Sequence, residues 1–383
     1  MADAARPIYL DHNASTPILP EVLDAMLPYL REEFGNPSSR HAYGRAARDA
    51  VERARDAVAG FIGADPSEIV FTSGGTESNN LAIFGASAAR PYRHHVVTTS
   101  VEHPAVRVPL ARLTRDGARV EVLPVGPSGR IREDAADVIG ESTLLVTVMM
   151  ANNETGAVQP VAALGARADR VGALLHVDAS QAMGKLPVDV RALNVSLLTL
   201  AGHKMYAPKG VGALYVRAGS MIAPRLLGAG HERGLRPGTE NVAGVVGLGA
   251  AARLLGDGLA QEASRQLGLT RRLFELLQGR VPGLALQGPA LSDPLRLPNT
   301  LSVSFPGVWG SAVLEHTPAV AASTGAACHD GQDTPSPGIL ALGIPEDVAR
   351  GTVRLSVGRG TTLEAVELAA AALARGWEAA RSG

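Results

Sequence analysis

The chain has 383 residues and a mass of 39.6 kDa, which is more than one hydrophobic core usually holds, so we expect two domains of unequal size. Apolar residues make up 46% and charged residues 19%, and this balance excludes an intrinsically disordered chain. The formal charge of -1 leaves no positive excess for binding phosphates, so we expect no direct nucleic-acid binding.

The N-terminus carries no basic region followed by an apolar stretch, and no apolar run is long enough to cross a bilayer. These observations predict a cytoplasmic protein with no membrane attachment. Residues 68–217 repeat one pattern, in which a short apolar run is followed by a polar or glycine-rich turn and by a stretch at helical spacing. The apolar runs are 68–71, 95–98, 119–122, 143–150, 173–177, 195–200 and 212–216.

Several of these runs are apolar almost throughout, as is typical of strands that helices cover on both faces. They predict a three-layer α/β domain with a mostly parallel sheet over residues 15–255. Residues 242–277 carry small and apolar residues at helical spacing and predict a long helix or a helix pair. The remaining pieces predict a smaller α+β domain, which comprises residues 1–14 and 256–383 and carries the loop around Cys328.

Polar side chains follow the apolar runs, at the sheet edge where ligands bind in α/β proteins. A reaction that needs a primary amine has three candidates, because the chain has three lysines. A lysine that forms a Schiff base must be partly desolvated so that its amine is uncharged for part of the time. Lys204 directly follows a buried run and meets this condition, whereas Lys185 and Lys209 fit better as solvated surface amines.

Asp178 ends another apolar run, where a carboxylate needs a cation beside it. A protonated pyridine nitrogen is such a cation, and the carboxylate would keep that nitrogen protonated so that the ring accepts electrons. A helix N-cap before residues 179–183 is an equally good explanation.

Gly75 and Thr76 lie at a strand-to-helix turn, where free amides and a hydroxyl suit a phosphate. An ordinary capped turn is the alternative, because the spacing matches no dinucleotide or nucleotide motif. His203 could add a donor to the same phosphate. His103 could lie on a flat cofactor ring and shuttle protons, although a lone loop histidine is more often a surface residue, as we expect of His95.

Cys328 is the one cysteine of the chain, which excludes an intramolecular disulfide and a multi-thiolate metal site built by one chain. A lone cysteine is usually a buried apolar group, but the small and polar neighbours of Cys328 predict an exposed loop whose thiolate can act as a nucleophile. Arg354 interrupts an alternating strand. Either an ion pair or a bidentate grip on a substrate carboxylate explains it.

Motifs along the chain resemble those of the cysteine desulfurases, which are pyridoxal 5′-phosphate (PLP) enzymes of the class V aminotransferase group. The matching segments run in order from about residue 8 to about residue 366 and include 9–17, 35–39, 71–80, 152–156, 176–181, 202–204, 231–234, 236–239 and 354–359. The resemblance implies the PLP-dependent transferase fold type I and a homodimer.

The resemblance also assigns roles to residues of this chain. The residues that would bind PLP are Lys204, Asp178, Gln181, Gly75, Thr76, His103, Asn153, His203 and, from the neighbouring subunit, Thr239. Lys204 would bond to the cofactor, Asp178 would pair with its pyridine nitrogen, and His103 would stack on its ring. Gln181 and Asn153 would lie near the ring oxygen, and Asn153 and Arg354 would hold the substrate.

The reaction that the resemblance implies converts L-cysteine to L-alanine. The freed Lys204 amine would remove the α-proton, and the Cys328 thiolate would attack the substrate sulfur and keep it as a persulfide. Because no second cysteine can resolve that persulfide, the sulfur must leave to an acceptor protein, such as an iron–sulfur scaffold or a thiolation protein. Iron–sulfur cluster assembly, tRNA thiolation and DNA phosphorothioation are the pathways that draw on such enzymes.

Three other readings stay open. Segments 236–241, 296–300 and 323–329 are also similar to the selenocysteine lyases, but Pro104 stands where selenium-specific members tend to carry an acidic residue, which favours cysteine. In an ordinary class V aminotransferase, Cys328 would have no role in the reaction, and a third alternative is a non-catalytic platform for sulfur-transfer partners.

The chain departs from the family pattern at one position of the phosphate site. Ala201 stands where well-known members carry a serine, so one hydroxyl that would bind the phosphate is missing.

Overall fold

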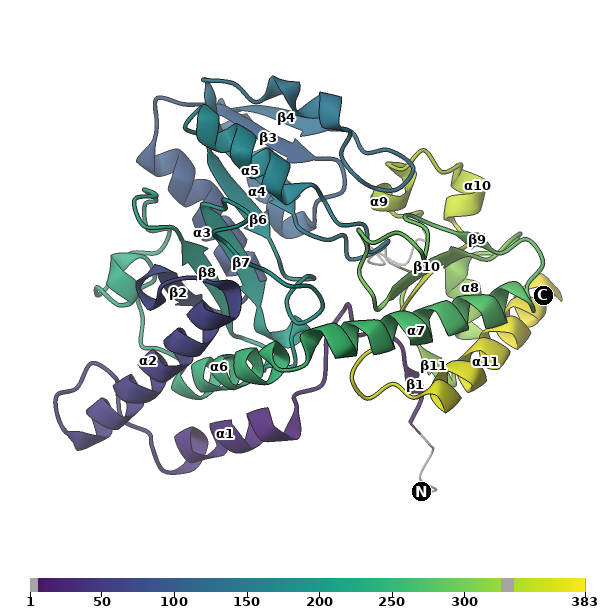
Figure 1. Ribbon diagram of the computed structural model, residues 1–383, viewed down its shortest axis with the longest axis horizontal. Helices are drawn as coiled ribbons and strands as arrows, with labels where there is room; N and C mark the ends of the chain where they lie inside the picture. Colours follow the sequence, from purple (N-terminus) through teal and green to yellow (C-terminus); the bar gives the residue numbers. More distant parts are fainter. Residues whose placement is uncertain (1–5, 325–333, 383) are drawn as a thin grey trace.

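The computed structural model describes residues 6–324 and 334–382 (Figure 1). A sheet of seven strands in the order β2-β8-β7-β6-β5-β3-β4 forms the larger part, and β8 runs antiparallel to both of its neighbours. The remaining pairs in this sheet are parallel. Its strands are β2 (Ile69–Thr72), β3 (His95–Thr99), β4 (Arg119–Leu123), β5 (Thr143–Met149), β6 (Leu174–Asp178), β7 (Leu197–Ala201) and β8 (Gly212–Val216).

Helices cover both faces of this sheet, which confirms the predicted three-layer α/β fold class. Successive strand residues enter different cores: Val96 packs into one hydrophobic cluster and Val97 into the other. The helices of this part are α1 (Pro20–Arg31), α2 (Ala42–Ile62), α3 (Gly75–Ala89), α4 (Pro104–Arg115), α5 (Val161–Arg170) and α6 (Val242–Gly256).

A three-stranded antiparallel sheet in the order β12-β10-β9 and a parallel pair of β1 and β11 form the smaller part. A separate hydrophobic cluster lies under them and includes Leu10, Phe305 and Trp377. The elements are β1 (Ile8–Tyr9), β9 (Ala285–Leu286), β10 (Thr300–Ser304), β11 (Val320–Ala321), β12 (Thr352–Ser356), α8 (Gly310–Glu315), α9 (Pro337–Leu340), α10 (Glu346–Ala349) and α11 (Leu363–Ser382). The domain boundaries given above stay a prediction.

The segment predicted as a long helix or a helix pair is a pair, α6 followed by α7 (Leu259–Gln278), which extends toward the smaller sheet (Figure 1). Within the described residues, no single helix is long and apolar enough to span a bilayer. In the part of the chain that the structure describes, one helix pair, α6 with α7, reaches that length and composition, and it is bent by 80°.

His95 is buried, which corrects the prediction of a surface histidine. It begins β3, and its Nδ1 lies 3.0 Å from the Thr143 hydroxyl while its Nε2 lies 3.3 Å from Glu121. Burial lowers the pKa of His95, with a further contribution from Arg119. This histidine therefore links β3 to both of its neighbouring strands, β5 and β4.

A buried ion pair fixes the segment around residue 232 against the large sheet. Arg55 donates to both carboxylate oxygens of Glu232, at 2.7 and 2.9 Å, and the Phe71 amide donates to the same carboxylate at 2.7 Å. Glu232→Ala is expected to lower the free energy of unfolding by about 3–5 kcal/mol, because it removes the buried partner of the Arg55 charge and leaves only the exposed Glu52 beside it.

Denaturant unfolding of the apo-protein measures this effect. Glu52→Ala is the matched control, because Glu52 also pairs with Arg55 but its side chain is 56% exposed. That change is expected to cost about 1 kcal/mol or less. Equal losses in the two variants would contradict the importance of the buried pair.

Candidate active site

The polar segments that follow the strands meet at one edge of the large sheet. β6 ends at Asp178, β7 ends at Ala201, and a single turn of 3-10 helix over Gly202–Lys204 follows directly. Because β6 and β7 are parallel neighbours, their ends lie side by side and bring Asp178 and Lys204 to the same edge.

Asp178 is a buried carboxylate with two short hydrogen bonds. Its Oδ2 accepts from the Asn79 side-chain amide at 2.8 Å, and its Oδ1 accepts from the Ser180 backbone amide at 3.0 Å. Residues 180–185 form turns, so the helix that the N-cap alternative requires is not there. The carboxylate instead caps a turn and keeps lone pairs for a further donor.

Lys204 lies with its amine largely out of water. Its Nζ donates to the Asn13 carbonyl oxygen at 3.0 Å. The pKa of Lys204 is lowered from 10.5 to about 8. Burial is the largest cause and Arg354 adds to it, while Asp178 and Asp11 act in the opposite direction. The desolvation expected of a reactive lysine is therefore present at this position.

A lowered pKa predicts a pH dependence for the chemistry of this amine. Only the uncharged amine attacks an aldehyde, so its covalent reaction with added PLP in the apo-protein is expected to accelerate as pH rises through about 8. Stopped-flow absorbance over pH 6 to 11, in buffers without amines, measures the midpoint, and Lys209→Ala serves as the exposed-lysine control. A midpoint near 10.5, the ordinary lysine value, would contradict this account.

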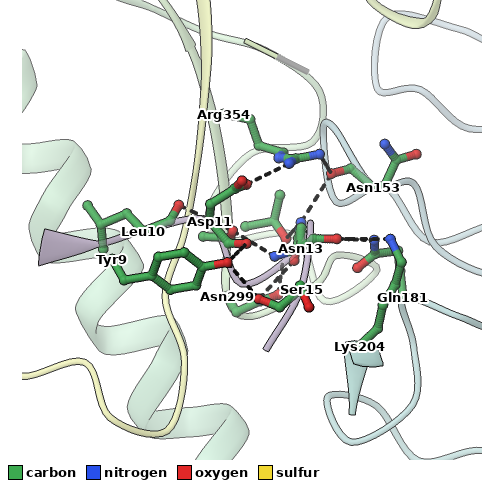
Figure 2. Close-up of polar contacts among 12 residues, drawn as sticks. Tyr9, Leu10, Asp11, Asn13, Ser15, Asn153, Gln181, Lys204, Asn299 and Arg354 are labelled. Atoms are coloured by element: carbon green, nitrogen blue, oxygen red, sulfur yellow. Dashed lines mark hydrogen bonds and ion pairs between the residues drawn. The ribbon is translucent and has the colours of Figure 1, made fainter. Parts of the chain in front are cut away.

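Asn13 is the hub of the polar contacts at this edge (Figure 2). Its carbonyl oxygen accepts from Lys204 and from the Gln181 side-chain amide, the latter at 2.9 Å. Its own side chain donates to the Thr300 hydroxyl at 2.8 Å and to the Asn153 carbonyl at 3.1 Å. Asn13 thus joins the chain's N-terminal segment, both sheets and the reactive amine.

Arg354 lies on the other side of this hub (Figure 2). It forms an ion pair with Asp11 at 2.7 Å and donates to the Asn153 carbonyl oxygen at 3.2 Å. Among residues 6–324 and 334–382, its buried Nε has no hydrogen-bond partner. Of the two explanations predicted for Arg354, the structure contains the ion pair. In addition, Nε can still donate a hydrogen bond to an acceptor from outside the described residues.

The first turn of α3 forms an open cradle of backbone amides. No side chain caps this helix in the described part of the chain, where Gly74 is the N-cap residue. A Cβ added at Gly75 would lie 3.1 Å from the Ser180 hydroxyl and 3.3 Å from the Ala201 Cβ, so these two side chains face the same point. Free amides at a helix start attract anions.

His203 and His103 lie beside this edge as neutral imidazoles. Burial and the neighbouring lysines lower the pKa of His203 to about 4, and its Nδ1 lies 3.3 Å from the Ser15 hydroxyl. His103 caps α4, since its Nδ1 accepts from the Ala105 amide at 3.1 Å. Burial also lowers the pKa of His103. Together with Thr76, His103 lines a cavity of about 380 Å³.

Lys185 is not a surface residue, which corrects the prediction made for it. It is 5% exposed and donates from Nζ to the Gln181 carbonyl oxygen at 3.0 Å. Lys209 is exposed in a turn, as predicted.

One predicted site residue, Thr239, lies apart from this cluster. Thr239 lines a separate cavity of about 880 Å³ whose walls include Ser38, Arg48 and His231 but not Thr76 or Lys204. Cys328 lies outside the described residues.

Comparisons with known proteins identify the family. The family model described as "Aminotransferase class-V" matches residues 8–368. This chain belongs to the class-V aminotransferase family. Within it, the chain is 44% identical over 358 residues to a cysteine desulfurase from Trichormus azollae, which covers 93% of this chain and 89% of that protein.

Solved structures of the family have the same architecture. A NifS-like protein superposes with a TM-score of 0.90 at 34% identity, covering 96% of this chain and 98% of that one. The structure of SspA in complex with cysteine superposes with a TM-score of 0.79 at 35% identity, covering 91% and 98% of the two chains. The cysteine desulfurase resemblance read from the motifs is therefore confirmed.

The structure adds residues to this class-V aminotransferase site that the sequence did not single out. Asn13 and Asp11 lie in a recognised motif, but their contacts with Lys204 and Arg354 join residues 191 and 343 positions apart. Asn79 lies in α3 one helical turn after Gly75, and this spacing is the sequence signal that could have predicted its place beside Asp178.

Proposed function

We propose that the protein is a PLP-dependent cysteine desulfurase that converts L-cysteine to L-alanine and keeps the sulfur as a persulfide on Cys328. The observation that carries this proposal is that a desolvated lysine, Lys204, and a buried carboxylate, Asp178, lie at the ends of adjacent strands on the same edge of the sheet. Relatives of this chain that bear the name cysteine desulfurase support the substrate.

The residues present fit pyridoxal phosphate. At the Gly75 cradle, no side chain from the described residues caps the amides, which leaves them for a phosphate, and Asp178 keeps acceptor capacity for a pyridinium N–H. Lys204 has the lowered pKa that bonding to an aldehyde requires. When bound, the cofactor supplies an electron sink that stabilises negative charge at the substrate α-carbon.

We assign the cofactor-binding roles as follows. Gly75, Thr76 and His203 would hold the phosphate, with Ser180 facing the position where Ala201 lacks a hydroxyl. The residues that would contact the ring are Asp178 at the nitrogen, His103 over the face, and Gln181 and Asn153 near the ring oxygen. Lys204, once released from the cofactor, would take the α-proton onto Nζ, which a pKa of about 8 allows near neutral pH.

Arg354 and Asn153 would hold the substrate. The Arg354 guanidinium already has Asp11 on one nitrogen and the Asn153 carbonyl on another. A substrate carboxylate would therefore either replace Asp11 or bind at Nε, which has no partner in the described part of the chain.

The sulfur step uses Cys328 as the nucleophile. Its thiolate would attack the substrate Sγ, the Cβ–Sγ bond would break, and the electron pair would remain on the carbon side and take up a proton to give alanine. The products are L-alanine and one persulfide, with no oxidant consumed. Cys328 is the one cysteine in the chain, so the persulfide would pass its sulfur to an external acceptor protein.

We also propose a cytoplasmic homodimer. Thr239 lines a cavity whose walls do not include Thr76, which agrees with a role at the phosphate of the second copy. Phe34 is 78% exposed and stacks on the half-exposed Tyr43 at a ring distance of 5.4 Å. An exposed aromatic pair of this kind suits a buried position at a protein interface.

The test is to measure alanine released from L-cysteine and from L-selenocysteine by the PLP-loaded protein. We expect turnover of L-cysteine with one persulfide formed per alanine in the first turnover. Activity confined to L-selenocysteine would instead favour a selenocysteine lyase, the second candidate, which similarity at residues 323–329 supports.

A further inference from the structure

Lys185 is a buried amine that the proposed reaction does not use. It is 5% exposed, and no carboxylate pairs with it among the ion pairs of residues 6–324 and 334–382. Burial, together with the nearby charges of Lys204 and Arg354, lowers the pKa of Lys185 to about 7. A buried amine without a counter-ion is costly, so a methionine or leucine would suit this place better if it served packing alone.

The hydrogen bonds of Lys185 go to one residue, Gln181, four positions earlier. Its Nζ donates to the Gln181 main-chain oxygen at 3.0 Å and to the Gln181 side-chain Oε1 at 3.4 Å. The other end of that amide, Nε2, donates to the Asn13 carbonyl oxygen at 2.9 Å.

These two partners fix which way the amide faces. A lysine amine that donates can meet only the oxygen end, and a carbonyl can meet only the nitrogen end. The Asn13 carbonyl also accepts from Lys204 Nζ, so the donor end of Gln181 lies beside the reactive amine (Figure 2). One hydrogen on Nε2 remains for a further acceptor there.

We infer that Lys185 is a positioning residue that orients the Gln181 amide so that its Nε2 donates to the ring oxygen of the cofactor. This inference rests on the proposed function, which places Gln181 near that oxygen. A donor stabilises the anionic form of the ring oxygen. Loss of the donor therefore moves the protonation midpoint of the bound cofactor to higher pH.

Lys185 also carries a charge, which offers a rival explanation. The titratable and charged groups near it are Lys204, Arg354, His12 and His203. Removing a cation from this group would by itself raise the same midpoint. The two explanations differ in one respect, because a charge effect does not need Gln181.

The experiment is a double-mutant cycle read by absorbance. Lys185→Met, Gln181→Leu and the double variant are loaded with PLP, and the visible band is titrated against pH without substrate. Lys185→Met is expected to raise the midpoint by about one to two pH units, the size of a lost hydrogen bond to a charged group. In the Gln181→Leu background, Lys185→Met is expected to cause almost no further shift.

The inference is overturned by an equal shift in both backgrounds, which would assign the effect to charge, or by no shift in either. Lys185→Gln keeps a donor without the charge and is expected to retain the wild-type midpoint. A shift like that of Lys185→Met would contradict the inference, and this variant decides the question where Lys185→Met does not fold. If the wild-type protein binds no PLP at all, the proposed function fails instead.

Discussion

Replacing Lys204 by alanine is expected to abolish covalent attachment of PLP and to lower alanine release from L-cysteine by at least about 10²–10⁴-fold. The chain has three lysines. The Lys185 amine is buried and donates to the Gln181 main-chain oxygen, and Lys209 lies in an exposed turn. Neither can replace an amine that lies at the end of β7. The loss includes both the bond to the cofactor and the base that takes the α-proton.

Borohydride reduction followed by intact-mass analysis measures the attachment. The wild-type protein and the Lys209→Ala control are expected to gain the mass of one cofactor, and Lys204→Ala is expected to gain none. Reduced cofactor found on another residue of Lys204→Ala would show that the reactive amine has been assigned to the wrong position.

Replacing Cys328 by serine is expected to lower sulfur release to the background rate while PLP binding is retained. A serine hydroxyl remains protonated at neutral pH and is a far weaker nucleophile than a thiolate. No other thiol in the chain can take its place. Substrate is still expected to perturb the visible band, because the residues that contact the cofactor are unchanged.

Sulfide and alanine assays with and without an added thiol measure this result. Undiminished turnover of amino and keto acids by Cys328→Ser would favour an ordinary aminotransferase. A protein that stays colourless after addition of PLP would favour the non-catalytic platform.

Much of the fold could be predicted from local patterns. Each predicted apolar run overlaps a strand of the large sheet, and most of these strands are apolar because they are buried on both faces. The same pattern predicts Asp178 and Lys204 as site residues, because each is a charged residue at or just after the end of such a run. The reversed direction of β8 could not be predicted, because its five residues carry no mark of direction.

Contacts between residues that are far apart in the sequence could not be predicted either. Asn13 bonds to Thr300 and Lys204, which are far from it along the chain, and only the folded structure shows their meeting. Lys185 was predicted at the surface because its neighbours are polar. In the structure, residues 180–185 form turns in which its amine donates to the Gln181 main-chain oxygen, and the local sequence does not show that this segment is buried.

The most direct test of the account follows the sulfur atom through a single turnover. The PLP-loaded protein is mixed with a limiting amount of sulfur-labelled L-cysteine without reductant, and the digested protein is mapped while alanine is counted. The account predicts one alanine per labelled sulfur and all of the protein-bound label on the peptide that contains Cys328. Label on any other residue, or alanine formed with no label on the protein, would contradict it.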